Sequence, residues 1–170
     1  MSTYKIVEET EVLLAVTKFL IGRGIFPYQF SITQHGRLNT QNQILSLFDS
    51  LDSKPTFSTT GPDIIGISEK EWWQVECKGF GSGQYQTHKN HFDRSLASIV
   101  SYYEDNFQGP EGKFKGAQPF LGLALPTSPK YLNLLTKRVR MPLRKKLNLW
   151  LLLYDVNSDS IKSVSPNEEF

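Results

Sequence analysis

The chain has 170 residues, of which 39% are apolar and 21% charged, with a formal net charge of +2. These values are ordinary for a soluble globular protein with a core, and the length predicts one domain over residues 1–170. The apolar runs are far shorter than the roughly 18 residues of a membrane helix, and the N-terminus lacks the pattern of a secretion signal. A single cysteine, Cys77, excludes an internal disulfide and a multi-cysteine zinc site, so we expect a cytoplasmic protein.

Apolar residues at helical spacing predict a helix from Thr3 to about Ile21. Glu9 falls near the middle of the apolar stripe of this helix, Glu8 at its edge and Glu11 on its polar face. Two interpretations of Glu9 remain open. It lies at the solvent end of the stripe, near a helix N-terminus where acids are favoured, or it faces a bound metal ion.

The next segments predict strands and loops. Residues 27–34 are rich in alternating and β-branched side chains and predict a strand. Residues 39–51 could form a short helix, whereas residues 52–60 are rich in Ser, Thr and Pro and predict a loop. Residues 61–79 predict a hairpin, in which the apolar run 64–67 is joined by a short polar turn to a second strand.

The predicted hairpin brings three charged residues together. Side chains alternate between the faces of a strand, so Glu76 and Lys78 point the same way, while Val75 and Cys77 point into the opposite layer. Asp63 stands at the mouth of the first strand. Two acids and a lysine are therefore predicted on one surface, which suits a divalent cation.

Beyond the hairpin, helices and strands alternate. A glycine-containing loop at 79–83 precedes a predicted helix from about Thr87 to Asp105, and a loop follows at 106–117. The further expected elements are a strand, a helix capped by Ser128 and a strand, over residues 119–125, 129–139 and 147–155, and residues 160–164 could form a last strand. The core order α-β-β-β-α-β-α-β predicts an α/β fold with a central mixed β-sheet flanked by helices.

This pattern resembles the PD-(D/E)XK nuclease superfamily. The resemblance is carried by Pro62 and Asp63 at the start of one strand and by Glu76 and Lys78 on the next, with a helix before and after the hairpin. It implies a restriction-endonuclease-like core and hydrolysis of DNA phosphodiester bonds by a metal-activated water. It also implies that Asp63, Glu76 and the main-chain carbonyl of Cys77 hold Mg²⁺ or Mn²⁺, and that Lys78 orients the water or stabilises charge on the phosphate.

The resemblance adds Glu9, or else Glu8, as an outer metal ligand that binds through water. It also implies phosphate contacts at the start of the helix that follows the hairpin, where Gln86 and Lys89 are the better candidates. The basic run 137–146 offers further nucleic-acid-binding candidates, namely Arg138, Arg140, Arg144 and Lys145. The alternative for Gln86 and Lys89 is an ordinary polar start of a helix. The alternative for the basic run is a solvated helix end.

A metal-dependent DNA endonuclease of restriction or DNA-processing type is the first hypothesis from the sequence. The alternatives are a catalytically inactive or accessory nucleic-acid-binding domain of the same fold, and a junction or repair nuclease. A chain of 170 residues has limited room for both cleavage and base readout. We therefore expect the chain to bind DNA as a homodimer, or together with a second protein that supplies specificity. We expect no association with a membrane.

Overall fold

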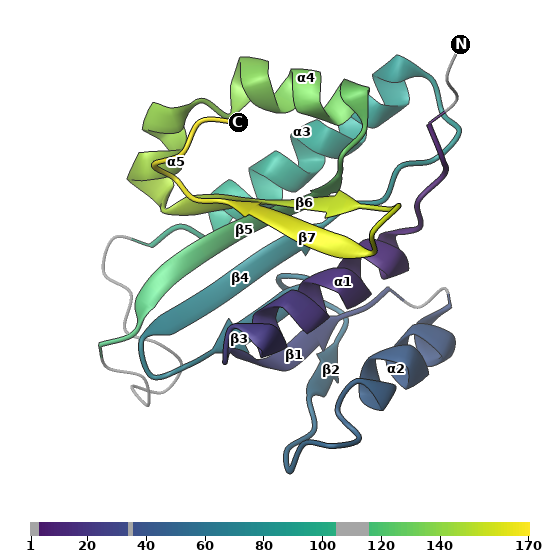
Figure 1. Cartoon of the computed structure of the whole chain (residues 1–170), viewed down its shortest axis with the longest axis vertical. Coiled ribbons are helices and arrows are strands. Elements are labelled where there is room, and N and C mark those ends of the chain that lie inside the picture. The colour runs from purple at the N-terminus through teal and green to yellow at the C-terminus, as the bar shows by residue number, and fades with distance from the viewer. Residues whose placement is uncertain (1–3, 34–35, 105–115) are drawn as a thin grey trace.

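A seven-stranded mixed β-sheet forms the centre of the computed structural model, with strand order β2-β1-β3-β4-β5-β6-β7 (Figure 1). The structure describes residues 4–33, 36–104 and 116–170. Its elements are α1 (Glu9–Gly22), β1 (Phe26–Ser31), α2 (Arg37–Ser46), β2 (Thr56–Ser58), β3 (Ile64–Ile67), β4 (Glu71–Cys77), α3 (Tyr85–Ser101), β5 (Gln118–Pro126), α4 (Pro129–Arg138), α5 (Met141–Leu147), β6 (Leu149–Asp155) and β7 (Ser160–Val164). The predicted α/β class with a mixed sheet is therefore confirmed.

The predicted hairpin forms the middle of the sheet. Strands β3 and β4 are antiparallel, and Ile64 lies opposite Val75. Strands β4, β5 and β6 are parallel, which requires the crossover helices α3, α4 and α5 between them. Cys77, the last residue of β4, lies opposite Ala124 near the end of β5. The carboxyl ends of these two strands therefore meet at one end of the sheet.

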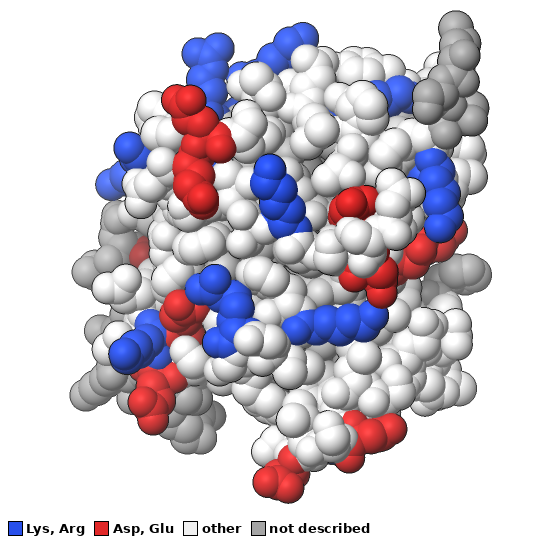
Figure 2. Space-filling model, in the orientation of Figure 1, with Lys and Arg blue, Asp and Glu red and all other residues white. Residues whose placement is uncertain are grey.

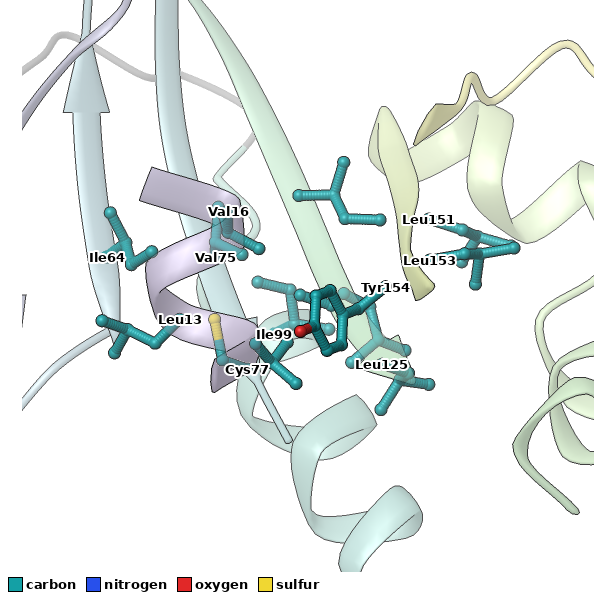
Figure 3. Close-up of a cluster of buried hydrophobic side chains, with 14 of the residues drawn as sticks. Leu13, Val16, Ile64, Val75, Cys77, Ile99, Leu125, Leu151, Leu153 and Tyr154 are labelled. Atoms are coloured by element: carbon teal, nitrogen blue, oxygen red, sulfur yellow. The ribbon is translucent and has the colours of Figure 1, made fainter. Parts of the chain in front are cut away.

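Helices cover both faces of the sheet. Helix α1 crosses one face, while α3 and the adjacent α4 lie over the other (Figure 1). Figure 3 shows Val75 and Cys77 of β4 beside Leu13 and Val16 of α1, and all four are buried. The inward direction predicted for Val75 and Cys77 is therefore confirmed. No helix within the described ranges is long and apolar enough to cross a membrane.

The observed order of elements differs from the predicted one. Strand β2 lies inside the segment 52–60 that was expected to be a loop, and it pairs parallel to β1 over three residues. Helix α5 forms within the basic run, where only the end of α4 was expected. Helix α2 corresponds to the short helix that was considered for residues 39–51. These elements are short and bury few residues, so they carry little of the apolar periodicity on which the prediction depends.

The first helix begins later than predicted. It starts at Glu9, and Thr3, where it was expected to start, lies outside the described residues. Val7 pairs instead with Phe80, because each main-chain N–H donates to the carbonyl of the other residue, at 2.8 and 2.7 Å. The main-chain N–H of Glu8 donates to the Glu11 carboxylate at 2.7 Å. These contacts fix the start of α1 at the end of the sheet where β4 finishes.

Candidate metal and nucleic-acid site

Two carboxylates of the hairpin lie close together where β4 ends. Asp63 directly precedes β3, and its Oδ2 accepts a hydrogen bond from the main-chain N–H of Cys77 at 2.7 Å. Glu76 lies on β4, and its Oε1 accepts a hydrogen bond from the hydroxyl of Tyr102 at 2.9 Å. Among the described residues, no donor reaches Asp63 Oδ1 or Glu76 Oε2. Each carboxylate thus keeps one oxygen available to a cation.

The electrostatics of these carboxylates favour a cation. Burial raises the pKa of Asp63 well above its ordinary value, and the charge of Glu76 adds to this effect. Burial also raises the pKa of Glu76, against the opposing effects of the Tyr102 hydrogen bond and of the Lys78 charge. A bound cation would offset both the cost of burial and the repulsion between the two acids.

Lys78 and Glu9 form an ion pair beside the two carboxylates. Lys78 directly follows β4, and its Nζ donates to Glu9 Oε2 at 2.5 Å. Burial alone lowers the pKa of Lys78, but the hydrogen bond with Glu9 and the charges of Asp63 and Glu76 raise it overall. The ammonium group is therefore charged at neutral pH.

Glu76 and Lys78, which were expected to point the same way, are held by different helices. Glu76 contacts the end of α3 through Tyr102, whereas Lys78 contacts α1 through Glu9. The charges of Glu76 and Lys78 still act on each other, so both belong to one site. Glu9 is the first residue of α1, a position where acids are favoured, and its carboxylate pairs with Lys78.

A close approach of two main-chain segments holds this end of the site together. At Gly79, an added Cβ would lie 2.5 Å from the carbonyl oxygen of Val7 and 2.6 Å from the nitrogen of Glu9. The hydroxyl of Tyr131, on α4, donates to the Gly79 carbonyl at 2.9 Å. Only glycine therefore lets α1 approach the residue that follows Lys78 without displacement of the main chain.

The residues present fit a magnesium ion with a partly hydrated shell. Among the described residues, no three His, Cys, Asp or Glu side chains form a group that could hold a metal ion. Mg²⁺ is usually bound by one or two carboxylates while water fills its other positions. The free oxygens of Asp63 and Glu76 match that requirement, and the resemblance adds the Cys77 carbonyl. Glu9 gives one oxygen to Lys78, and Glu8 is exposed at the start of α1.

A cleft opens beside the carboxylates. Its volume is about 260 Å³, and both Asp63 and Glu9 line it. Its walls also carry four hydroxyl side chains from α1, α2 and the end of β1, namely Thr10, Ser31, Thr33 and Thr40. The cleft therefore offers neutral hydrogen-bonding groups next to the acids.

Comparison with known proteins yields no relative. No family model matches the chain, and neither does a curated protein or a solved structure. The chemistry of the site is therefore inferred from its own residues. These are the acids Asp63 and Glu76, the Lys78–Glu9 pair and the main chain around Gly79.

The two polar candidates on α3 are engaged within that helix. Gln86 is exposed, and its amide donates to Asn90 at 2.8 Å. Lys89 forms an ion pair with Asp93 at 2.9 Å. The same Asp93 accepts a hydrogen bond from Arg138 at the end of α4. Lys89 and Arg138 are thus partly neutralised by one shared acid.

The remaining basic candidates lie away from the carboxylates. Lys145 lines a pocket with Gln118, at the start of β5, and Gln118 pairs with Glu71 at the start of β4. The site lies at the opposite end of β4, which is about 20 Å away at about 3.3 Å per residue. Arg140 and Lys145 are exposed and form no ion pair with the described residues. On the face seen in Figure 2, basic and acidic side chains are interspersed.

Arg144 has a structural role instead of a surface one. It is only 2% exposed, and its guanidinium donates to the carbonyls of Ser165 and Glu168 at 2.9 and 2.6 Å. It also lies over the ring of Phe170, 5.5 Å from its centroid. The predicted phosphate contact of Arg144 is not compatible with this burial, because the guanidinium anchors the C-terminal segment.

We expect Arg144→Met to lower the free energy of unfolding by about 2–3 kcal/mol, because it removes charged hydrogen bonds from two carbonyls. Urea unfolding monitored by circular dichroism measures this change. Lys145→Met is the matched control, since the exposed neighbour should change stability by less than about 0.5 kcal/mol. Equal stability of both variants would contradict the anchoring role.

Three residues of the site were not among the sequence-based candidates. Tyr102 is the C-cap of α3 and Tyr131 lies on α4, and no spacing rule connects them with the hairpin. Gly79 follows Lys78 directly, and a glycine after a strand is a signal of close main-chain approach that could have identified it.

Proposed function

We propose that this chain is a metal-dependent DNA endonuclease with a PD-(D/E)XK-type site on a restriction-endonuclease-like core. One observation carries the proposal: Asp63 and Glu76, each with a free oxygen, lie beside the charged Lys78 at the end of one hairpin. Mg²⁺ or Mn²⁺, when bound, would polarise the scissile phosphate and lower the pKa of a bound water.

The chain's own residues divide the remaining tasks. Asp63 and Glu76 hold the cation through their free oxygens, and Lys78 places a positive charge where negative charge develops on the phosphate. Glu9 keeps the Lys78 ammonium in place through the 2.5 Å contact. The hydroxyl-lined cleft beside Asp63 accommodates the part of the strand that adjoins the scissile phosphate.

Flanking nucleic acid is the proposed ligand of the exposed basic residues. Duplex DNA carries one charge per about 1.7 Å of its axis. Basic residues about 20 Å from the carboxylates can therefore contact phosphates several base pairs from the cut. Arg140 and Lys145 are suited to such contacts because they are exposed. A homodimer or a partner protein would supply base readout, for which one domain of 170 residues has limited room.

A plasmid assay tests this function. Supercoiled DNA incubated with the protein and Mg²⁺ or Mn²⁺ should be nicked, and EDTA should stop the reaction. Asp63→Asn should remove at least about 99% of the nicking, because one carboxylate ligand is lost while the fold is kept. Asp49→Asn is the control, since Asp49 is an exposed acid away from the site.

The same assay separates the alternatives. DNA binding without nicking by the unmodified protein under any metal would indicate an accessory nucleic-acid-binding domain. Preferential cleavage of a four-way junction over linear duplex would indicate a junction or repair nuclease. Equal nicking by the wild type and Asp63→Asn would contradict the proposed site.

A further inference from the structure

We infer that Tyr102 is a positioning residue of the metal site, whose hydroxyl fixes one oxygen of Glu76 and leaves the other for the cation. This inference rests on the proposed metal site. The hydroxyl of Tyr102 donates to Glu76 Oε1 at 2.9 Å, and within the described part of the chain Glu76 accepts no other hydrogen bond. The orientation of this ligand therefore depends on one donor.

Tyr102 is well placed to act as a fixed support. It is the C-cap of α3, where its main-chain N–H donates to the carbonyl of Ile99 at 3.2 Å. The ring is partly buried and packs against the hydrophobic core. Phe92 and Ile99 on the same helix are fully buried, which holds α3 against the sheet. A carboxylate on a strand is thus oriented by a hydroxyl at the end of a packed helix.

The two acids are supported in different ways. Asp63 is held by the main-chain N–H of Cys77, which no substitution other than proline can remove. Glu76 is held by a side chain, so a single hydroxyl can be deleted without changing either acid. Partners of this kind that orient a metal ligand typically account for about 10–100-fold in metal affinity or activity.

Tyr131 provides a matched comparison. Its hydroxyl donates to the main-chain carbonyl of Gly79 at 2.9 Å, and among the described residues it forms no hydrogen bond with Asp63 or Glu76. Loss of the Tyr131 hydroxyl loosens the chain after Lys78 but leaves the contact of Glu76 intact. Tyr102→Phe and Tyr131→Phe therefore separate the orientation of a ligand from general bracing of the site.

The experiment measures Mn²⁺ binding by the decrease of the free-ion EPR signal, with no nucleic acid present. We expect Tyr102→Phe to raise the Kd for Mn²⁺ by about 10-fold or more. Tyr131→Phe should raise it less, and Tyr28→Phe should leave it unchanged, because Tyr28 packs on Trp72 toward the other end of β4. Wild-type affinity in Tyr102→Phe, or equal losses in the Tyr102 and Tyr131 variants, would overturn the inference.

A second measurement avoids dependence on the folding of the variant. With 3-fluorotyrosine at position 102 of the full chain, the ¹⁹F resonance should shift on addition of Mg²⁺, whereas the label at position 28 should not. An unchanged resonance at position 102 in a protein that binds Mn²⁺ overturns the positioning role alone. A wild-type protein that binds no Mn²⁺ overturns the metal site and this inference together.

Discussion

Lys78→Ala is expected to lower metal-dependent nicking by about 10²–10³-fold, the usual loss when one group that stabilises developing charge is removed. The loss should fall on kcat, because the ammonium acts on charge that develops only in the transition state. Stability should change by less than about 1 kcal/mol, since Lys78 and Glu9 are both partly solvated and such pairs contribute little. Single-turnover nicking at saturating Mg²⁺, alongside thermal unfolding, measures both effects.

Two further variants locate this effect. Lys70→Ala removes an exposed lysine from the turn of the same hairpin and should nick like the wild type. Glu9→Gln keeps the shape of the side chain but removes the charge that holds Lys78. If Glu9 positions the lysine, Glu9→Gln should reduce nicking and leave Mn²⁺ affinity unchanged. A large fall in Mn²⁺ affinity would show instead that Glu9 is a metal ligand, as the resemblance implied.

The fold was predictable where a segment carries a long periodic pattern. Strand β5 and helix α4 have a continuous apolar run and a Ser128 cap, respectively, and both form where expected. Strand β2 has three residues and no buried one, so its pairing with β1 depends on a tertiary contact that leaves no mark on the local sequence. The predicted loop 106–117 lies mostly outside the described residues.

The candidate site also contains some residues that local sequence could place and others that it could not. Asp63 and Glu76 could be placed together because a hairpin is a local structure whose register follows from its own residues. The partner of Glu76 is 26 residues away at the end of a helix, and the partner of Lys78 is 69 residues away. Arg144 was wrongly predicted to be exposed, because a charged residue in a basic run usually faces solvent. Its actual partners are main-chain carbonyls of the C-terminal segment. Contacts between distant segments decide all three cases.

Gly79→Ala is expected to damage both stability and activity. The added methyl group would lie 2.5–3.0 Å from main-chain atoms of Val7, Glu8 and Glu9, and none of these is the movable end of a side chain. The start of α1 must therefore move away from β4, which should lower the free energy of unfolding by about 1–3 kcal/mol. Because this movement separates Glu9 from Lys78, nicking should fall by about 10²-fold, as displacements of about 1 Å can cause. Urea unfolding and the plasmid assay measure the two losses.

Gly81→Ala is the matched control, because an added Cβ at Gly81 meets no atom within 4 Å. Both substitutions place alanine in the same loop and restrict the unfolded chain equally, so their difference isolates the contact between α1 and the end of β4. If Gly79→Ala keeps wild-type stability and nicking, the start of α1 does not hold Lys78 in place. If it loses stability but not nicking, the main-chain contact supports the fold, and Lys78 reaches its position without Glu9.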